Sequence, residues 1–392
     1  MINLAVIFGG KNVEHEVSII SAVQAMEHLN KDKYNIIPIY ISKDEEWYTG
    51  ECLLNIDSYK DFAKLKNEAT KCYIIKDKNK FYLKGKKILN FLKKEIDIVL
   101  PIVHGTNVED GILQGYLQTI GIPYCFSNVC ASSIAQDKVI QKMIFDKENI
   151  LTPNYFYFYD VEYYNDKDTY LRKAKELKYP VIIKPATLGS SVGINIANNE
   201  DELQKYIEEA IKYDKKILVE KVISNLKELN ISVLGNYESQ ECSLIDEIIN
   251  ESKFFTYEEK YLSNNKNKTE FKGKNTSTRK IPADISEELK SEVENTAKRA
   301  FKAIGSSGLI RIDFLYDTKS NKLYLNEVNN IPGSLAFYLW EPKGKKYTEL
   351  LDEIIKIGIK EQRNNSSKQF NFETNILSNF NGSKFKKEQK SK

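Results

Sequence analysis

Apolar runs and amphipathic stretches alternate along the first third of the chain. Residues 2–8, 34–41 and 97–103 are almost wholly apolar, which is typical of strands buried on both faces of a parallel sheet. The stretches that follow the first and third runs, up to about His28 and Ile120, instead repeat apolar residues with the helical period. Strand, turn and helix in this order predict an open parallel α/β sheet.

Farther along, shorter apolar runs are separated by polar turns, which predicts two smaller α+β units. Expected strands lie at 217–221, 229–235, 245–249, 308–317 and 322–329, and expected helices at 200–213, 286–304 and 348–360. We therefore expect an N-terminal α/β domain at 1–122, a central unit at 123–222 and a C-terminal unit at 223–362. The polar run within 254–281 lacks periodicity, which is typical of a mobile lid or a disordered insert, and we expect a lid there. The Asn- and Lys-rich residues 363–392 indicate a disordered tail.

The last two expected strands flank a wholly polar turn, as in a β-hairpin. With the turn at its centre, Asp313 lies opposite Glu327 and Arg311 lies opposite Asn329, all on one face. The same face is expected to carry three leucines, Leu315, Leu323 and Leu325. A solvated face would not hold three leucines, so the charged end is expected to be an enclosed site.

The chemistry of this hairpin allows two interpretations. Two carboxylates and an amide oxygen suit a hard divalent cation such as Mg²⁺, and Arg311 beside them could stabilise charge that develops in a reaction. A cross-strand ladder of salt bridges explains the same residues equally well. Residues 330–334, Asn-Ile-Pro-Gly-Ser, stop the strand and expose backbone N–H groups, which favours an anion site beside a metal.

Glycine turns follow the first and third strands, at the edge where a parallel sheet binds ligands. The first turn leads to Glu14, which could bind a polar ligand or only favour the helix dipole. His104 ends the third strand; a lone histidine is more often structural, but this position modestly favours a ligand contact. Residues 189–193, Gly-Ser-Ser-Val-Gly, can approach a phosphate closely, with Lys184 placed to bridge its oxygens.

Other charged residues are less specific. Lys138 and Lys142 lie one helical turn apart, which fits either a solvated face or the edge of a phosphate pocket. Glu220 and Lys221 end a strand, where the backbone edge could bind an adenine ring.

Composition limits the class of protein. The 392 residues are 41% hydrophobic and 29% charged, as in a soluble globular protein of two or three domains. With 58 basic and 55 acidic residues the net charge is +3, so we expect neither a nucleic acid nor a membrane as partner. The N-terminal run lacks a basic leader, and the five cysteines lack zinc-type spacing, so we expect a cytoplasmic protein with free thiols.

These motifs resemble those of the ATP-grasp superfamily, and within it the D-alanine:D-alanine ligases, over about residues 1–362. The matching stretches are Phe8-Gly-Gly with Glu14 to Ser18, His104-Gly with Glu109-Asp-Gly, Ala131 to Lys138, Ile183-Lys-Pro with Gly189 to Gly193, Tyr257 to Tyr261, Arg311-Ile-Asp-Phe, and Asn326 to Asn329 with Pro332-Gly333. Seven ordered motifs are far more specific than any one of them. The resemblance implies an ATP-grasp fold, α/β with an α+β nucleotide-binding part, in which an N-terminal substrate domain is followed by two smaller domains that sandwich ATP.

The resemblance also implies an activity and its residues. The activity is ATP-dependent, ADP-forming ligation of two D-alanines through an acyl phosphate, for peptidoglycan precursor synthesis, by a cytoplasmic enzyme that could be a homodimer. The cofactors implied are ATP and two Mg²⁺ ions, with Mn²⁺ as an alternative. The ATP-binding residues implied are Lys138, Lys184, Ser191, Glu220, Lys221, Ile223, Glu228 and Lys260, and the metal ligands implied are Asp313, Glu327 and Asn329. The catalytic residues implied are Glu14, Ser190, Tyr261, Arg311 and Gly333, and the further substrate-binding residues are His104, Ser334 and Tyr338.

The roles follow the same resemblance. Glu14 is expected to bind the ammonium of the first substrate in a triad with Ser190 and Tyr261, and Arg311 is expected to form an oxyanion site with the N–H of Gly333. His104 should lie near the first substrate's carboxylate. Three lysines should contact the ATP phosphates, namely Lys138, Lys184 and, from the lid, Lys260. Glu220 and the backbone near Ile223 should contact adenine, and Glu228 should contact the ribose.

Several positions depart from the family pattern. Val108 stands where the family has glycine, Cys125-Phe126 replaces the usual residue-glycine pair, Asn330 replaces threonine, and the lid is longer than usual. Tyr338 falls where a family serine grips the second amino acid's carboxylate, so Tyr338, Ser334 or a lid residue should hold it here. The acceptor therefore remains open between D-alanine and D-serine, D-lactate or another amino acid. A catalytically silent nucleotide-binding module is a third hypothesis, disfavoured because no metal ligand and no arginine of the motif is lost.

Overall fold

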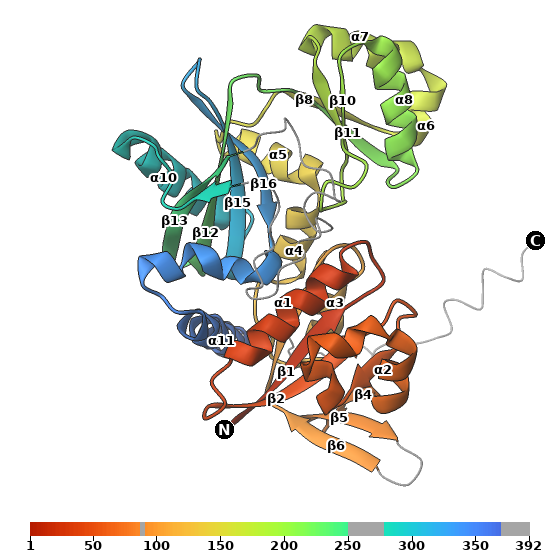
Figure 1. Cartoon of the computed structure of the whole chain (residues 1–392), viewed down its shortest axis with the longest axis vertical. Coiled ribbons are helices and arrows are strands. Elements are labelled where there is room, and N and C mark those ends of the chain that lie inside the picture. Colours follow the sequence, from red (N-terminus) through yellow and green to blue (C-terminus); the bar gives the residue numbers. More distant parts are fainter. Residues whose placement is uncertain (87–90, 250–277, 370–392) are drawn as a thin grey trace, which may run out of the picture.

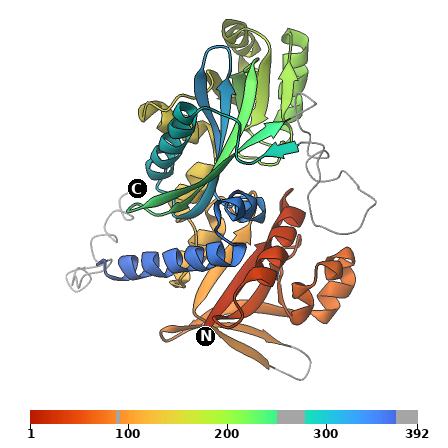
Figure 2. The same ribbon diagram turned by 60° about the vertical axis from the view of Figure 1, so that its left-hand side comes forward.

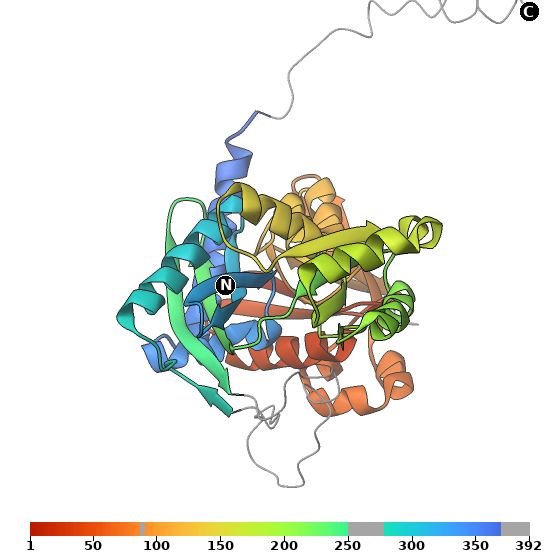
Figure 3. The same ribbon diagram turned by 90° about the horizontal axis from the view of Figure 1, so that it is seen from above.

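A computed structural model describes residues 1–86, 91–249 and 278–369. The strands within these ranges form three sheets that follow one another along the chain. The first sheet and its helices occupy one end of the molecule, and the second and third sheets lie beside each other at the other end (Figures 1 and 3). Within these described ranges no helix is long and apolar enough to cross a membrane.

The first sheet has seven strands in the order β6-β5-β4-β3-β2-β1-β7. Its three predicted strands pair in parallel as β1 (Ile2–Gly9), β2 (Tyr34–Ile41) and β7 (Ile98–Val103). Both faces of this part are covered, since Leu4 to Phe8 are fully buried. The helices of this unit are α1 (His15–His28), α2 (Phe62–Glu68) and α3 (Ile112–Ile120), with 3-10 turns η1 (Glu51–Leu54) and η2 (Ile56–Lys60).

Four antiparallel strands extend this sheet, and the sequence pattern did not predict them. They are β3 (Trp47–Thr49), β4 (Thr70–Asp77), β5 (Lys80–Lys86) and β6 (Phe91–Ile96). Their lysines alternate with apolar residues because one side of this ribbon faces solvent, and such segments are easily mistaken for polar loops.

The second sheet is small and has the order β10-β9-β11-β8. Its strands are β8 (Tyr155–Tyr159), β9 (Val181–Pro185), β10 (Asn195–Ala197) and β11 (Lys216–Lys221), and its helices are α6 (Asp160–Asn165), α7 (Lys167–Leu177) and α8 (Glu200–Ile211). Val181, Ile183, Ile217 and Val219 share a core with α7 and α8. Because strand side chains alternate, Lys184, Leu218 and Glu220 point to the opposite face.

The third sheet is wholly antiparallel, in the order β14-β13-β12-β15-β16. Its strands are β12 (Leu226–Gly235), β13 (Gln240–Ile249), β14 (Thr278–Lys280), β15 (Gly308–Asp317) and β16 (Lys322–Asn329), and α10 (Glu287–Ala303) packs on it. Residues 129–147, which were assigned to the central unit, form helices α4 (Val129–Gln136) and α5 (Lys138–Lys147), and these contribute Ala135 and Phe145 to this core. Val139 of α5 also packs against Leu218, so α5 lies between the second and third sheets.

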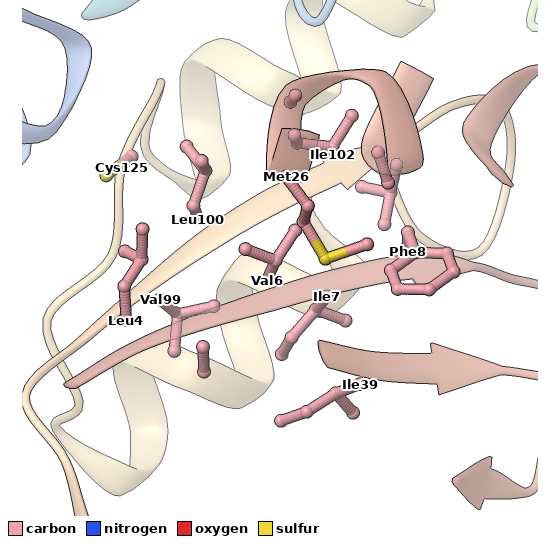
Figure 4. Packing of buried hydrophobic residues seen from close by; sticks show 14 of the residues in the cluster. Leu4, Val6, Ile7, Phe8, Met26, Ile39, Val99, Leu100, Ile102 and Cys125 are labelled. Carbon is pink, nitrogen blue, oxygen red and sulfur yellow. The ribbon is translucent and has the colours of Figure 1, made fainter. Parts of the chain in front are cut away.

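The largest core combines both ends of the chain. Apolar residues of β1, β2, β7 and α1 fill it, as Figure 4 shows. The same cluster contains Leu335 of η3 (Gly333–Leu339), Trp340 directly after η3, and Leu350 and Ile354 of α11 (Tyr347–Ser366). Figure 2 shows α11 lying beside the N-terminal unit. A short 3-10 turn, η4 (Glu341–Lys343), joins these last two elements.

The end of α11 corrects one prediction. The sequence pattern ended the last helix at Lys360 and began a disordered tail at residue 363, but the helix continues to Ser366. Residues 370–392 of the predicted tail and residues 254–277 of the predicted lid lie outside the described residues.

Candidate active site

The β15–β16 hairpin has the predicted pairing. Arg311 lies opposite Asn329 and Asp313 lies opposite Glu327. The Arg311 guanidinium donates to both oxygens of Asp313, through Nε at 2.7 Å and Nη2 at 2.8 Å, and Asn329 Nδ2 donates to Asp313 Oδ2 at 3.1 Å. These residues therefore form the ladder of charged and polar contacts that one of the two interpretations expected.

A β-bulge changes the rest of this face. The register shifts after Asp313, so that Phe314 pairs with Leu325 and Asn326 is the extra residue. Leu323 and Leu325 consequently point into the core with Phe314, and the prediction that they share a face with Asp313 is wrong. The bulge also lets Asn326 accept a hydrogen bond from Lys184 Nζ at 3.1 Å, a contact that the sequence pattern did not predict.

Two lysines face the hairpin from other elements. Lys138, the first residue of α5, places Nζ 3.4 Å from Glu327 Oε2 and donates to the carbonyl oxygen of Leu188 at 2.7 Å. Lys184 of β9 contacts Asn326. Both lysine side chains are only 8% exposed, so their charges are held in place rather than solvated. Such fixed cations beside carboxylates are suited to phosphate oxygens.

The side chain of Glu220 lies in a buried and charged environment. Its carboxylate is buried between Lys142 and Lys184, and the contact with Lys184 Nζ is 2.5 Å. Burial alone would raise the pKa of Glu220, but the two ammonium groups lower it below its ordinary value. The Glu220 side chain is therefore engaged by the two lysines, which leaves the backbone at this strand end to bind adenine.

The neighbouring nucleotide candidates are less constrained. Lys221 donates its Nζ hydrogens to the carbonyl oxygens of Lys178 and Tyr179. Ile223 lies before β12 and Glu228 is the third residue of that strand, and both are half-buried.

The glycine loop reaches the N-terminal unit. Ser190 donates a hydrogen bond to Glu14 Oε1, although the two residues are 176 positions apart. A Cβ atom on Gly189 would lie 2.6 Å from one Glu14 oxygen and 2.8 Å from the other, so only glycine allows this approach. Ser190 and Ser191 have positive φ angles of 53° and 60°.

The base of this loop is anchored separately. The N–H and the hydroxyl of Thr187 both donate to Asp214 Oδ2 at 2.8 Å, and Gln136 donates to the Thr187 carbonyl oxygen at 2.5 Å. The loop is thus fixed at its start in the central unit and bound at its tip to Glu14.

His104 and Glu109 lie beside Glu14 at the end of β7. Burial lowers the pKa of His104 to about 4, with a smaller contribution from Arg311, so the imidazole is neutral near pH 7. Glu109 accepts hydrogen bonds from the N–H groups of Gly105 and Ile331, both at 2.9 Å, and so joins this loop to the segment before Gly333. The sequence motif contained Glu109, but its pattern gave no sign of this link.

The segment after the hairpin forms η3, which begins at Gly333. The N–H of Ser334 donates to Ser21 Oγ at 2.9 Å, which ties η3 to α1. Tyr338 accepts a hydrogen bond at 3.0 Å from Arg279 of β14, whose guanidinium also lies 4.6 Å from the tyrosine ring. Arg279 pairs in addition with the fully buried Asp246. The remaining predicted residues, Lys260 and Tyr261, lie outside the described residues.

The hairpin can be tested for a fit to Mg²⁺. Nowhere in the described part of the chain do three or more His, Cys, Asp or Glu residues form a metal cluster. Mg²⁺ nevertheless is usually bound by one or two carboxylates together with substrate phosphates. Asp313, Glu327 and Asn329 provide those oxygens, and their present partners, Arg311 and Lys138, are cations that phosphate oxygens could also engage. The residues therefore fit a magnesium ion that arrives with a nucleotide.

Comparisons with known proteins agree with one another. The family model described as D-ala D-ala ligase N-terminus matches residues 3–127, and the one described as D-ala D-ala ligase C-terminus matches residues 144–356. A curated D-alanine–D-alanine ligase from Thermosipho africanus is 41% identical over 380 residues, covering 96% of this chain and 98% of the relative.

Solved structures give the same result. The D-alanine-D-alanine ligase from Coxiella burnetii superimposes with a TM-score of 0.78 at 27% identity, covering 93% of this chain and 96% of its own. A D-Ala:D-Ser ligase from Enterococcus faecalis has a TM-score of 0.74 at 29% identity, and the match covers 91% of this chain and 99% of that chain. The ATP complex of the Bacillus anthracis D-alanine–D-alanine ligase has a TM-score of 0.66 at 25% identity, and the match covers 93% of this chain and 100% of that chain. The predicted ATP-grasp fold is thereby confirmed, and this chain belongs to the D-alanine–D-alanine ligase family.

Proposed function

We propose that this protein is an ATP-dependent ligase that joins two D-alanine molecules into the dipeptide used in peptidoglycan precursor synthesis. The observation that carries the proposal is the convergence of three separate elements on one place. The glycine loop binds Glu14, two buried lysines face the hairpin, and the hairpin presents Asp313 and Glu327. Membership of a ligase family supports the proposal that this arrangement is an enzyme site and not only a salt-bridge ladder.

The first step is the transfer of the ATP γ-phosphoryl group to a carboxylate oxygen of the first D-alanine, which gives ADP and an acyl phosphate. Such a transfer needs mainly positioning and neutralisation of charge. Lys138 and Lys184 supply fixed positive charge, and Asp313, Glu327 and Asn329 would hold Mg²⁺. With Mg²⁺ held by these residues, the charge on the phosphate oxygens would be neutralised.

The second step is attack by the amine of the second D-alanine on the acyl carbon. A C–N bond forms, inorganic phosphate leaves with the C–O bond electrons, and the amine loses a proton. The tetrahedral oxyanion needs donors that are already in position, and Arg311 with the N–H of Gly333 can provide them. Glu14, fixed by Ser190, would bind the ammonium of the first substrate, and neutral His104 would lie near its carboxylate.

The acceptor site departs from the family pattern, since Tyr338 replaces the family serine. We propose that Tyr338 and Arg279 together hold the acceptor carboxylate, because Arg279 already donates to the phenol oxygen and a guanidinium is suited to a carboxylate. Arg279 falls in the predicted lid but within the described residues. The structural likeness to a D-Ala:D-Ser ligase keeps D-serine as the second candidate acceptor.

Location and assembly are proposals as well. All five cysteines are free, which suits a reducing cytoplasm. We propose a cytoplasmic enzyme that acts on small molecules, with a homodimer as the assembly to test by light scattering.

The function is tested by phosphate release from ATP with a panel of amino acid pairs, with product identified by mass spectrometry. D-alanine alone should give the highest rate and the D-alanyl-D-alanine mass. A higher rate for D-alanine with D-serine would select the second candidate. Lys184→Ala should raise the KM for ATP far more than that for D-alanine, since a charge on phosphate acts in ground and transition states. Absence of phosphate release with every pair would refute the proposal.

A further inference from the structure

Three charged side chains form a buried row beside the candidate phosphate site. Lys142 of α5, Glu220 of β11 and Lys184 of β9 meet so that Lys142 Nζ contacts Glu220 Oε1 and Lys184 Nζ contacts Glu220 Oε2. The side chains of Lys142 and Glu220 are each only 1% exposed. Three different elements are thus joined by ionic contacts that solvent does not reach.

The row carries an excess of positive charge. Two ammonium groups share one carboxylate, and only Lys184 has a further contact toward the hairpin, with Asn326 Oδ1 at 3.1 Å. Lys142 lies on the far side of Glu220, where its Nζ is 5.5 Å from the centre of the Tyr155 ring. The Tyr155 hydroxyl donates in turn to Asp146 at 3.0 Å. Lys142 therefore cannot reach a ligand at the hairpin while it holds these partners.

We propose that Lys142 is a positioning residue for nucleotide binding: it neutralises Glu220, so that Glu220 orients Lys184 without cancelling the charge that Lys184 presents to phosphate. This inference rests on the proposed ATP site. Without Lys142, Glu220 would have Lys184 as its only cationic partner of the row, and phosphate would compete with a buried carboxylate for the same ammonium. In this arrangement the Glu220 side chain orients Lys184, and the backbone of the strand end is what remains to bind adenine.

The energetics favour a functional reason for this row. Burying charges costs free energy, and apolar residues of similar volume often stabilise a core as well or better. Apolar side chains could therefore have packed α5 against the second sheet at this place, as Val139 and Leu218 do nearby. A charged row is useful where one of its members must present its charge to a ligand.

The test measures equilibrium binding of ATP, ADP and adenosine by calorimetry, with wild type, Lys142→Met and the double variant Lys142→Met with Glu220→Gln. Lys147→Met is the matched control, because Lys147 is exposed on the same helix. Lys142→Met should weaken the binding of ATP and of ADP about tenfold, which corresponds to the loss of one charge-assisted hydrogen bond. Adenosine binding should not change, since adenosine lacks phosphate, and the double variant should regain most of the ATP affinity.

Besides normal ATP binding by Lys142→Met, two results would overturn the inference. One is an equal loss of ATP and adenosine affinity in Lys142→Met, which would mean that Lys142 only supports the fold. The other is a double variant that binds adenosine normally but ATP no better than Lys142→Met does. If Lys142→Met fails to fold, the double variant still decides, because it replaces the buried ion pair by a neutral pair: near-normal ATP affinity supports the inference, and selective loss of ATP contradicts it.

The binding assay contains no amino acid, so its outcome is separate from that of the ligase assay. A wild type that binds ATP but releases no phosphate with any amino acid pair contradicts the proposed function alone. An active wild type whose Lys142→Met variant binds ATP normally contradicts the role of Lys142 alone.

Discussion

Replacing Gly189 by alanine should separate first-substrate binding from nucleotide binding. Gly189 has a backbone conformation outside the left-handed region, so alanine adds no backbone strain. The added Cβ would lie 2.6 Å from a Glu14 oxygen, whereas ordinary contact begins at 3.4 Å. Glu14 or the loop must therefore move, and the hydrogen bond between Ser190 and Glu14 is lost or lengthened.

The size of the effect follows from that bond. A hydrogen bond to a charged group contributes about 1.5–3 kcal/mol, which corresponds to about 10- to 100-fold in an equilibrium constant. We expect the KM for the first D-alanine to rise by about this factor. The KM for ATP should change little, because Thr187 anchors the loop base to Asp214 and Lys184 lies on β9 before the loop. Phosphate release measured while each substrate is varied in turn distinguishes the two constants.

Gly115→Ala is the matched control. Gly115 lies within α3, where the nearest atom to an added Cβ is 4.0 Å away, so alanine should be neutral or stabilising. An unchanged KM for D-alanine in Gly189→Ala would refute the reasoning, as it would show that Glu14 does not depend on the loop. An equal rise in both KM values would show instead that the whole loop had been displaced.

Three further outcomes are expected. Asp313→Asn or Glu327→Gln should abolish ATP turnover without lowering Tm by more than about 2 °C, because each removes a charged oxygen ligand; near-normal turnover at saturating Mg²⁺ would return the hairpin to a salt-bridge ladder. Tyr338→Ser should change the acceptor KM or the acceptor preference more than the KM for ATP, and an unchanged acceptor profile would place that substrate elsewhere. Burial, and secondly the Glu14 carboxylate, raise the pKa of Glu109 from 4.5 to about 8, so the folded state retains a proton that the unfolded chain releases. Stability should therefore fall as the pH rises from about 4.5 to about 8, and Glu109→Gln should flatten this dependence of Tm; parallel profiles would contradict it.

The hairpin shows how far sequence patterns reach. Alternation of apolar and polar residues was sufficient to predict both strands of the hairpin and the pairing of Asp313 with Glu327. The one extra residue at Asn326 was not predictable, because a bulge leaves the composition of a strand unchanged and alters only its register. That single residue reversed the direction of Leu323 and Leu325.

The burial of charged side chains was the second feature that the sequence patterns did not predict. Lys142 and Glu220 are ordinary charged residues in the sequence, and charged residues are mostly exposed. Their pairing depends on α5 packing between two sheets that are formed by later segments. The contact of Gly189 with Glu14 was likewise beyond local patterns, although a small-residue turn and an acid at a helix start had each been singled out.

The composition of the largest core affects the order in which the protein can fold during synthesis. Its N-terminal strands emerge from the ribosome early, but Trp340, Leu350 and Ile354 complete the same cluster and emerge last. The second sheet has a core built from residues 156–219 alone and can close as soon as they are available. Since domains generally fold as units during translation, the middle of this chain should acquire its native structure before the beginning does. A nascent chain stalled after residue 330 should then protect the second sheet from proteolysis while the first sheet remains open to cleavage.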